Sequence, residues 1–127
     1  MKDSSRIAAL RALHKSVAHR TTMPFEEFVE NISDFDIHPI RDRGEIIGAV
    51  MTRDNEIHLG VTRTPEGAHL RELRSILAGI IMRHGTAKTA VMHDNLPGIA
   101  FCRRIGFEET HMDERGVHFE LKEFGNA

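Results

Sequence analysis

Glu56 and His58 stand two positions apart in Glu56–Val61, a segment in which polar and apolar residues alternate. This alternation predicts a β-strand, so both side chains should project from the same face. A carboxylate or an imidazole there could accept a proton from a reacting group, and histidine titrates close to neutral pH. We take His58 as the first candidate for a general base and Glu56 as the second. The competing interpretation is an ordinary solvent-facing strand surface.

The chain has one cysteine, Cys102, and it has neither Tyr nor Trp. A single thiol excludes an internal disulfide framework and a zinc site built from several cysteines. A thiol with an ordinary pKa of about 8.5 can donate a proton, so Cys102 is a candidate general acid. It also lies on the apolar side of a short predicted helix beside Phe101 and Ile105, where a cysteine serves as a small buried hydrophobe. We expect the second role.

Nine histidines raise the question of a metal site. His111 and His118 flank the turn 113–116, so they should face each other across a hairpin. Two ligands do not make a zinc site, the sequence has no HExxH motif, and nothing in it selects Asp113 or Asp94 as a third ligand. We therefore expect a pair of cross-strand surface histidines and no metal cofactor.

The composition is that of one domain spanning residues 1–127, with 40% hydrophobic and 28% charged residues. No apolar run approaches the roughly 20 residues of a membrane-spanning helix, and the first residues lack the apolar stretch of a secretion signal. The net charge is -2, which argues against a protein that binds nucleic-acid phosphates. We expect a soluble, cytoplasmic domain without a membrane partner.

The first part of the chain should form two helices and then three strands. The first helix is predicted over Ser4–Arg20 from apolar residues at helical spacing, namely Ile7, Leu10, Leu13 and Val17. The second should begin at Pro24 and bury Phe25, Phe28, Val29 and Ile32. The strands Phe35–Arg41, Glu45–Thr52 and Glu56–Val61 should form an antiparallel meander, with Pro39 placing the first of them at an edge. Ile57, Leu59 and Val61 should share one face of the third strand.

A long central helix is predicted over Leu70–Arg83, with Gly85 as its C-terminal cap. Its apolar face should comprise Leu70, Leu73, Ile76, Leu77, Ile80 and Ile81. The remaining elements should be a strand, a short helix and a C-terminal hairpin, over Thr86–Met92, Gly98–Arg104, Phe107–Met112 and Val117–Phe124. This order predicts a layered α/β or α+β domain.

The most specific segment is Asn95–Phe107, which reads Asn-Leu-Pro-Gly-Ile-Ala-Phe-Cys-Arg-Arg-Ile-Gly-Phe. It resembles the late motif of the GCN5-related N-acetyltransferase (GNAT) superfamily, in which an Asn ends a strand, a short helix follows, and a basic turn closes on Gly-Phe. The order of elements from Phe35 onward is similar to that fold, and the resemblance covers residues 25–123. Within the superfamily, the chain looks closest to small acetyltransferase-like proteins of tailed bacteriophages.

The resemblance implies acetyl-CoA as co-substrate, with its pyrophosphate at backbone N–H groups where the central helix begins. The cofactor-binding positions that it implies are Val61, Arg63, Gly67, Ala68, His69, Leu70, Arg71 and Asn95. The loop departs from the family pattern, because His69 and Arg71 stand where small residues are usual and Glu66 stands where a basic residue is common. Arg63 or Arg71 could supply compensating charge, or the arginines could simply form a solvated helix face. The family's acid is often a Tyr, and Cys102 stands at that position.

Three functions follow from the resemblance. The first is an acyl-CoA-dependent N-acyltransferase that moves an acetyl group to an amine, with the thioester between the central strand and the strand ending at Met92. Backbone N–H groups would polarise its carbonyl there. The second is a non-catalytic GNAT-like phage protein that serves as a virion component or binding module, and the third is modification of a nucleic-acid base. A bacterial or phage-infected cell is the expected setting, and the last hairpin could pair with a second copy in a homodimer.

Overall fold

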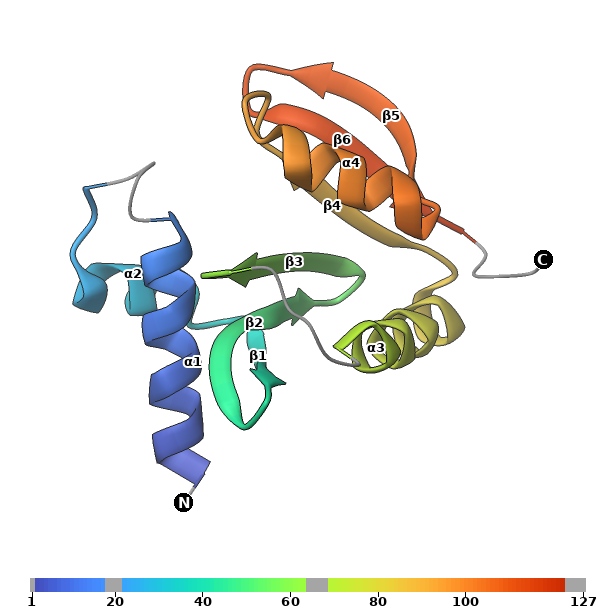
Figure 1. The fold of residues 1–127 in the computed structure, drawn as a ribbon. Helices are drawn as coiled ribbons and strands as arrows, with labels where there is room; N and C mark the ends of the chain where they lie inside the picture. Colours follow the sequence, from blue (N-terminus) through green and yellow to red (C-terminus); the bar gives the residue numbers. More distant parts are fainter. Residues whose placement is uncertain (1, 18–21, 64–68, 123–127) are drawn as a thin grey trace. The chain divides into compact units, whose positions relative to one another are not determined.

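The structure is a computed structural model, and it describes residues 2–17, 22–63 and 69–122. The helices in this part of the chain are α1 (Lys2–Val17), α2 (Phe25–Asn31), α3 (His69–His84) and α4 (Leu96–Ile105) (Figure 1). The strands are β1 (Asp36–Asp42), β2 (Glu45–Arg53), β3 (Glu56–Val61), β4 (Ala87–Val91), β5 (Glu108–Asp113) and β6 (Gly116–Leu121). They form a six-stranded sheet in the order β1-β2-β3-β4-β6-β5. The sequence prediction of a mixed α and β domain is confirmed.

The chain divides into two compact units. Unit 1 comprises Met1–Arg53 and His58–Leu73, and unit 2 comprises Asp54–Ile57 and Arg74–Ala127. Each unit contains buried apolar side chains, for example Leu13 in unit 1 and Phe119 in unit 2.

In unit 1, β1 is the edge strand of the sheet and pairs antiparallel with β2, as Pro39 predicted. The pairing runs from Asp36 opposite Thr52 to Asp42 opposite Glu45. Against it pack Ala9 and Leu13 of α1, which form a buried cluster with Ala49 of β2. Partly buried side chains complete this core, namely Phe28, Ile32, Ile37, Ile46 and Met51.

The apolar face of α1 differs from the predicted one. Ile7, the first residue of the predicted stripe, is 49% exposed, and Val17 is only half-buried. Leu10 and Leu13 are buried as predicted, and Ala9 and Ala12 are buried as well. Ala9 packs with Leu13 and with Ala49 of β2 in one buried cluster, and Leu13 also lies close to Gly60 of β3, where an added Cβ would be 2.9 Å from its Cδ2 atom. The helix begins earlier than Ser4, and residues 18–20 lie outside the described part of the chain.

The second and third helices largely follow their predictions. Pro24 is the N-cap of α2, and the predicted apolar residues of that helix are half-buried rather than fully buried. On α3, Leu73, Leu77 and Ile80 are buried. The helix is followed by Gly85, whose φ of 86° lies in the left-handed region and whose N–H donates to the Ile81 carbonyl oxygen at 2.7 Å.

Unit 2 contains most of α3, from Arg74 onward, together with β4, α4, β5 and β6. The strand β6 pairs antiparallel with both β4 and β5, and its buried side chains are Val117, Phe119 and Leu121. The first two residues of β3 also belong to this unit, and β3 pairs in parallel with β4 at Glu56 opposite Lys88. The C-cap of α4 lies near β6, since a Cβ on Gly106 would be 3.6 Å from Leu121 Cδ1. No helix among the described residues has the length and the apolar character that crossing a bilayer requires.

Candidate functional site

The two candidate bases lie on β3, and neither is on an open surface. Glu56 and His58 are both half-buried. The His58 ring meets the Phe35 ring nearly edge-on, with centroids 5.8 Å apart. The Arg53 guanidinium lies 4.3 Å from the centre of the same Phe35 ring and is paired with Asp34 at 2.8 Å. His58 therefore packs against a ring that is itself held by a cation and its ion pair.

Two glycines bring the backbones of unit 1 together near the end of β3. A Cβ on Gly48 would lie 2.0 Å from the Gly60 carbonyl oxygen, and a Cβ on Gly60 would lie 2.6 Å from Ser16 Oγ. Sequence reasoning missed both contacts, although glycine in a strand interior is a known sign of close backbone approach. Val61 ends the strand as predicted, and the N–H of Thr62 then donates to the Ile47 carbonyl oxygen at 2.8 Å.

Arg63 is engaged by two carboxylates of unit 1. Its guanidinium donates to Asp42 Oδ2 at 2.6 Å and to Glu45 Oε1 at 3.1 Å. These hydrogen bonds, first that to Asp42 and then that to Glu45, raise the pKa of Arg63. The Asp42 side chain is fully buried, so this pair ties the end of β3 to the β1–β2 turn. Binding a phosphate through Arg63 would compete with that pairing.

The rest of the predicted cofactor loop is only partly described. Gly67 and Ala68 lie outside the described residues, while His69 and Leu70 are the first two residues of α3. Arg71 follows them and is exposed. The first N–H groups of a helix have no partner within it, so the start of α3 is chemically suited to an anion.

Asn95 and the end of its segment define α4. The Asn95 Oδ1 atom accepts a hydrogen bond from the Gly98 N–H at 3.1 Å, which makes Asn95 the N-cap of the helix. Gly106 ends the helix with a φ of 117°. A Cβ on Gly98 would lie 2.5 Å from Asn95 Nδ2, so the Asn-x-x-Gly spacing has a structural explanation.

Cys102 is buried on α4. Burial raises the pKa of its thiol from 9.0 to about 11. At neutral pH the group is therefore protonated and is a weaker acid than an ordinary thiol. These properties agree with the expected role as a small hydrophobic residue.

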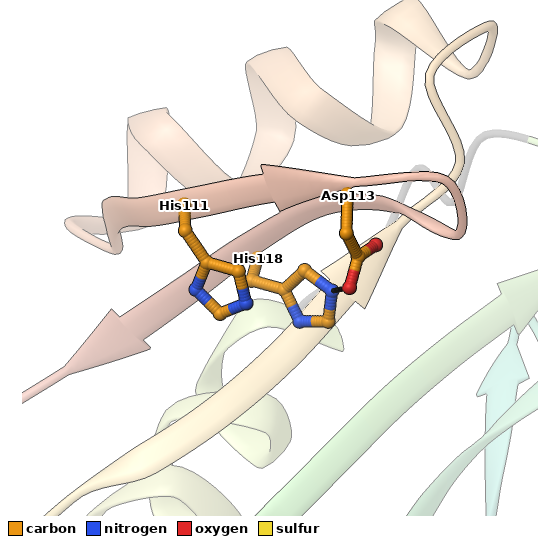
Figure 2. A group of neighbouring side chains, drawn as sticks. All are labelled: His111, Asp113 and His118. Carbon is orange, nitrogen blue, oxygen red and sulfur yellow. Dashed lines mark hydrogen bonds and ion pairs between the residues drawn. The ribbon is translucent and has the colours of Figure 1, made fainter.

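The last hairpin brings together His111, Asp113 and His118 (Figure 2). The two imidazole rings are stacked with centroids 4.2 Å apart, and His118 Nε2 lies 2.9 Å from Asp113 Oδ2. Slight burial would raise the pKa of Asp113, but hydrogen bonds from His118 and from the backbone of Arg115 and Gly116 outweigh it, and the pKa is lowered. The predicted facing of His111 and His118 is confirmed. Asp113, and not Asp94, is the acidic residue that the structure groups with them.

The fold is shared with solved N-acetyltransferases. An N-acetyltransferase from Staphylococcus aureus Mu50 has 13% sequence identity and a TM-score of 0.69, over 96% of this chain and 94% of that one. The PaiA N-acetyltransferase from Thermoplasma acidophilum, solved in complex with coenzyme A, has 17% identity and a TM-score of 0.58, over 92% and 89%. A putative acetyltransferase, yncA, from Salmonella typhimurium was solved with acetyl-CoA and has 15% identity and a TM-score of 0.60, over 99% and 91%.

The sequence itself matches no family model and no curated protein. At these identities the structural likeness concerns the fold. The chain has a GNAT-type fold, as the resemblance of Asn95–Phe107 predicted.

Proposed function

We propose that the protein belongs to the GNAT superfamily and transfers the acetyl group of acetyl-CoA to an amine. The observation that carries this proposal is the fold, which matches an N-acetyltransferase over 96% of this chain. Two of the compared proteins were solved with coenzyme A or acetyl-CoA, which supports acetyl-CoA as the co-substrate.

The pyrophosphate of acetyl-CoA would bind to backbone N–H groups of Gly67–Leu70, at the start of α3. The positive end of a 16-residue helix favours an anion in that place. Arg71 is the better source of additional charge, because it is exposed at this helix end, whereas Arg63 is paired with two carboxylates.

His58 is the proposed base and Glu56 the alternative. The base would remove a proton from the amine as its nitrogen attacks the thioester carbonyl carbon, and the C–S bond would then break to release the thiolate of coenzyme A. The buried Cys102, with a pKa of about 11, is a poor donor to that thiolate. A thiolate of ordinary pKa, about 8.5, is stable enough to leave without a strong acid.

Thermal unfolding with acetyl-CoA tests binding, and release of coenzyme A thiol in the presence of a panel of amines tests catalysis. Acetyl-CoA at 100 times its Kd should add about 2.7 kcal/mol of stability. Gly67→Val should weaken coenzyme A binding more than Arg103→Ala, because a side chain at 67 would block the approach to the backbone. Equal affinities in the two variants would contradict the placement of the pyrophosphate.

The base assignment needs a separate measurement. His58→Gln should lower kcat at least tenfold while the Kd for acetyl-CoA stays constant, because general base help contributes roughly 10²–10⁴-fold. Glu56→Gln is the matched variant on the same strand. A larger loss of kcat in Glu56→Gln would transfer the role to Glu56.

A non-catalytic GNAT-like protein, such as a phage virion component or binding module, is the second candidate. The observations that favour it are the engagement of Arg63 by Asp42 and Glu45 and the burial of Cys102. Binding of acetyl-CoA without thiol release for any amine would support this candidate over the transferase.

A further inference from the structure

Three potential metal ligands project from one face of the β5–β6 hairpin in unit 2 (Figure 2). His111 and Asp113 are two residues apart on β5, and alternate residues of a strand share a face. His118 of β6 lies directly opposite His111 in the strand register. The ligand atoms of the three residues all lie within 4.8 Å of one another.

Neighbouring groups orient these side chains. The Asp113 Oδ1 atom accepts hydrogen bonds from the backbone N–H groups of Arg115 and Gly116 at 2.9 and 3.2 Å, which directs Oδ2 toward His118. Gly116 stands opposite Asp113, and a Cβ at this position would collide with the Val91 backbone. The His111 Nδ1 atom lies 3.0 Å from the Thr110 hydroxyl, so Nε2 is the atom left for a ligand bond.

The site can be reached from solvent. The side chains of His118 and Asp113 are 24% and 41% exposed, and His111 is exposed as well. In tetrahedral zinc sites the bonds are about 2.0–2.2 Å long, which places ligand atoms roughly 3.4 Å apart. His118 Nε2 and Asp113 Oδ2 already lie 2.9 Å apart, so closure mainly requires the exposed His111 ring to turn out of its stack.

Two imidazoles and one carboxylate select a particular group of metals. Imidazole nitrogen suits Zn²⁺, Cu²⁺, Ni²⁺ and Fe²⁺, whereas Mg²⁺ and Ca²⁺ prefer sites made of oxygen. We propose that His111, Asp113 and His118 bind one divalent transition-metal ion of the Zn²⁺ and Ni²⁺ type, with water in the remaining positions. This revises the sequence-based expectation of no metal, which rested on the lack of an assigned third ligand. The proposal is independent of acyl transfer.

The test is metal titration of the full, tag-free chain after treatment with a chelator. Isothermal calorimetry with Zn²⁺, and separately with Ni²⁺, should give one site per chain, and millimolar Mg²⁺ or Ca²⁺ should not compete. His111→Gln, His118→Gln and Asp113→Asn should each weaken Zn²⁺ binding at least tenfold. Asp113→Asn keeps a side-chain oxygen that can accept the hydrogen bonds from the Arg115 and Gly116 N–H groups. The turn is therefore preserved in this variant, and weaker Zn²⁺ binding would report the loss of the carboxylate.

His93→Gln is the matched control. His93 is also an exposed histidine beside the hairpin, where its Nε2 lies 2.6 Å from the Asp113 carbonyl oxygen, but it is not part of the cluster. This variant should bind Zn²⁺ with the affinity of the parent chain. The proposal is overturned if the parent chain does not bind Zn²⁺ below 1 mM or if the three ligand variants keep its affinity. It is equally overturned if His93→Gln loses as much affinity as they do.

Discussion

Asn95 and Gly98 lie so close at the start of α4 that mutations of the two should not have independent effects on stability. Asn95 Oδ1 accepts the Gly98 N–H, and a Cβ at position 98 would stand 2.5 Å from Asn95 Nδ2 and 2.9 Å from its Cγ. Gly98→Ala must therefore displace the Asn95 side chain and weaken the cap. The same substitution removes a glycine from a helix, which by itself is stabilising.

The magnitudes can be worked out for each background. Asn95→Ala should cost about 1 kcal/mol, the usual value for loss of an N-cap side chain. Gly98→Ala should gain about 0.8 kcal/mol from helix propensity and lose about 1 kcal/mol from the cap, for a net change near zero. With Asn95→Ala already present there is no cap to lose, so Gly98→Ala should stabilise by about 0.8 kcal/mol. The expected coupling energy is about 1 kcal/mol.

The cycle compares the parent chain, Asn95→Ala, Gly98→Ala and the double variant. Their free energies of unfolding are measured by urea unfolding at 25 °C, followed by circular dichroism and by hydrogen exchange of α4. Gly79→Ala is the matched control, since Gly79 lies inside α3 and its added Cβ would meet only the flexible Arg83 side chain, at 3.3 Å. It should have the same effect whether Asn95 is present or not. Equal stabilisation by Gly98→Ala in both backgrounds would refute the assignment of Asn95 as a cap that needs glycine at 98.

Two further predictions concern packing and pH. Gly60→Ala should destabilise unit 1 by roughly 1–3 kcal/mol, because the added Cβ would lie 2.6 Å from Ser16 Oγ and 2.9 Å from Leu13 Cδ2. An unchanged midpoint of urea unfolding would contradict this close packing. Burial raises the pKa of Cys102 from 9.0 to about 11, so its contribution to folding stability should be complete below pH 9 and lost as the pH rises toward 11. Urea unfolding at about pH 7.5 and about pH 10 measures the difference in unfolding free energy between the parent chain and Cys102→Ala. This difference should be smaller at the higher pH. A constant difference would show that the thiol is not shielded from solvent.

Local patterns in the sequence predicted most of the fold. Alternation identified β3, helical spacing identified α3, and glycines at 85 and 106 marked helix ends because both adopt a positive φ. The face of α1 was predicted less well. Hydrophobic periodicity weights large side chains, whereas Ala9 is buried through its packing with Ala49 of β2 and Ile7 is exposed.

The candidate site was predictable only where chain geometry links its residues. A two-residue turn fixes the register of the last hairpin, so His111 had to face His118, whereas the sequence did not select Asp113 over Asp94 as their acidic neighbour. The partners of Arg63 are 21 and 18 residues away in the sequence, across a strand and a turn. No local period encodes such a pairing, since it depends on where the end of β3 meets the β1–β2 turn. An arginine that matches a cofactor motif can therefore be paired with carboxylates of its own fold, and the sequence alone does not reveal that pairing.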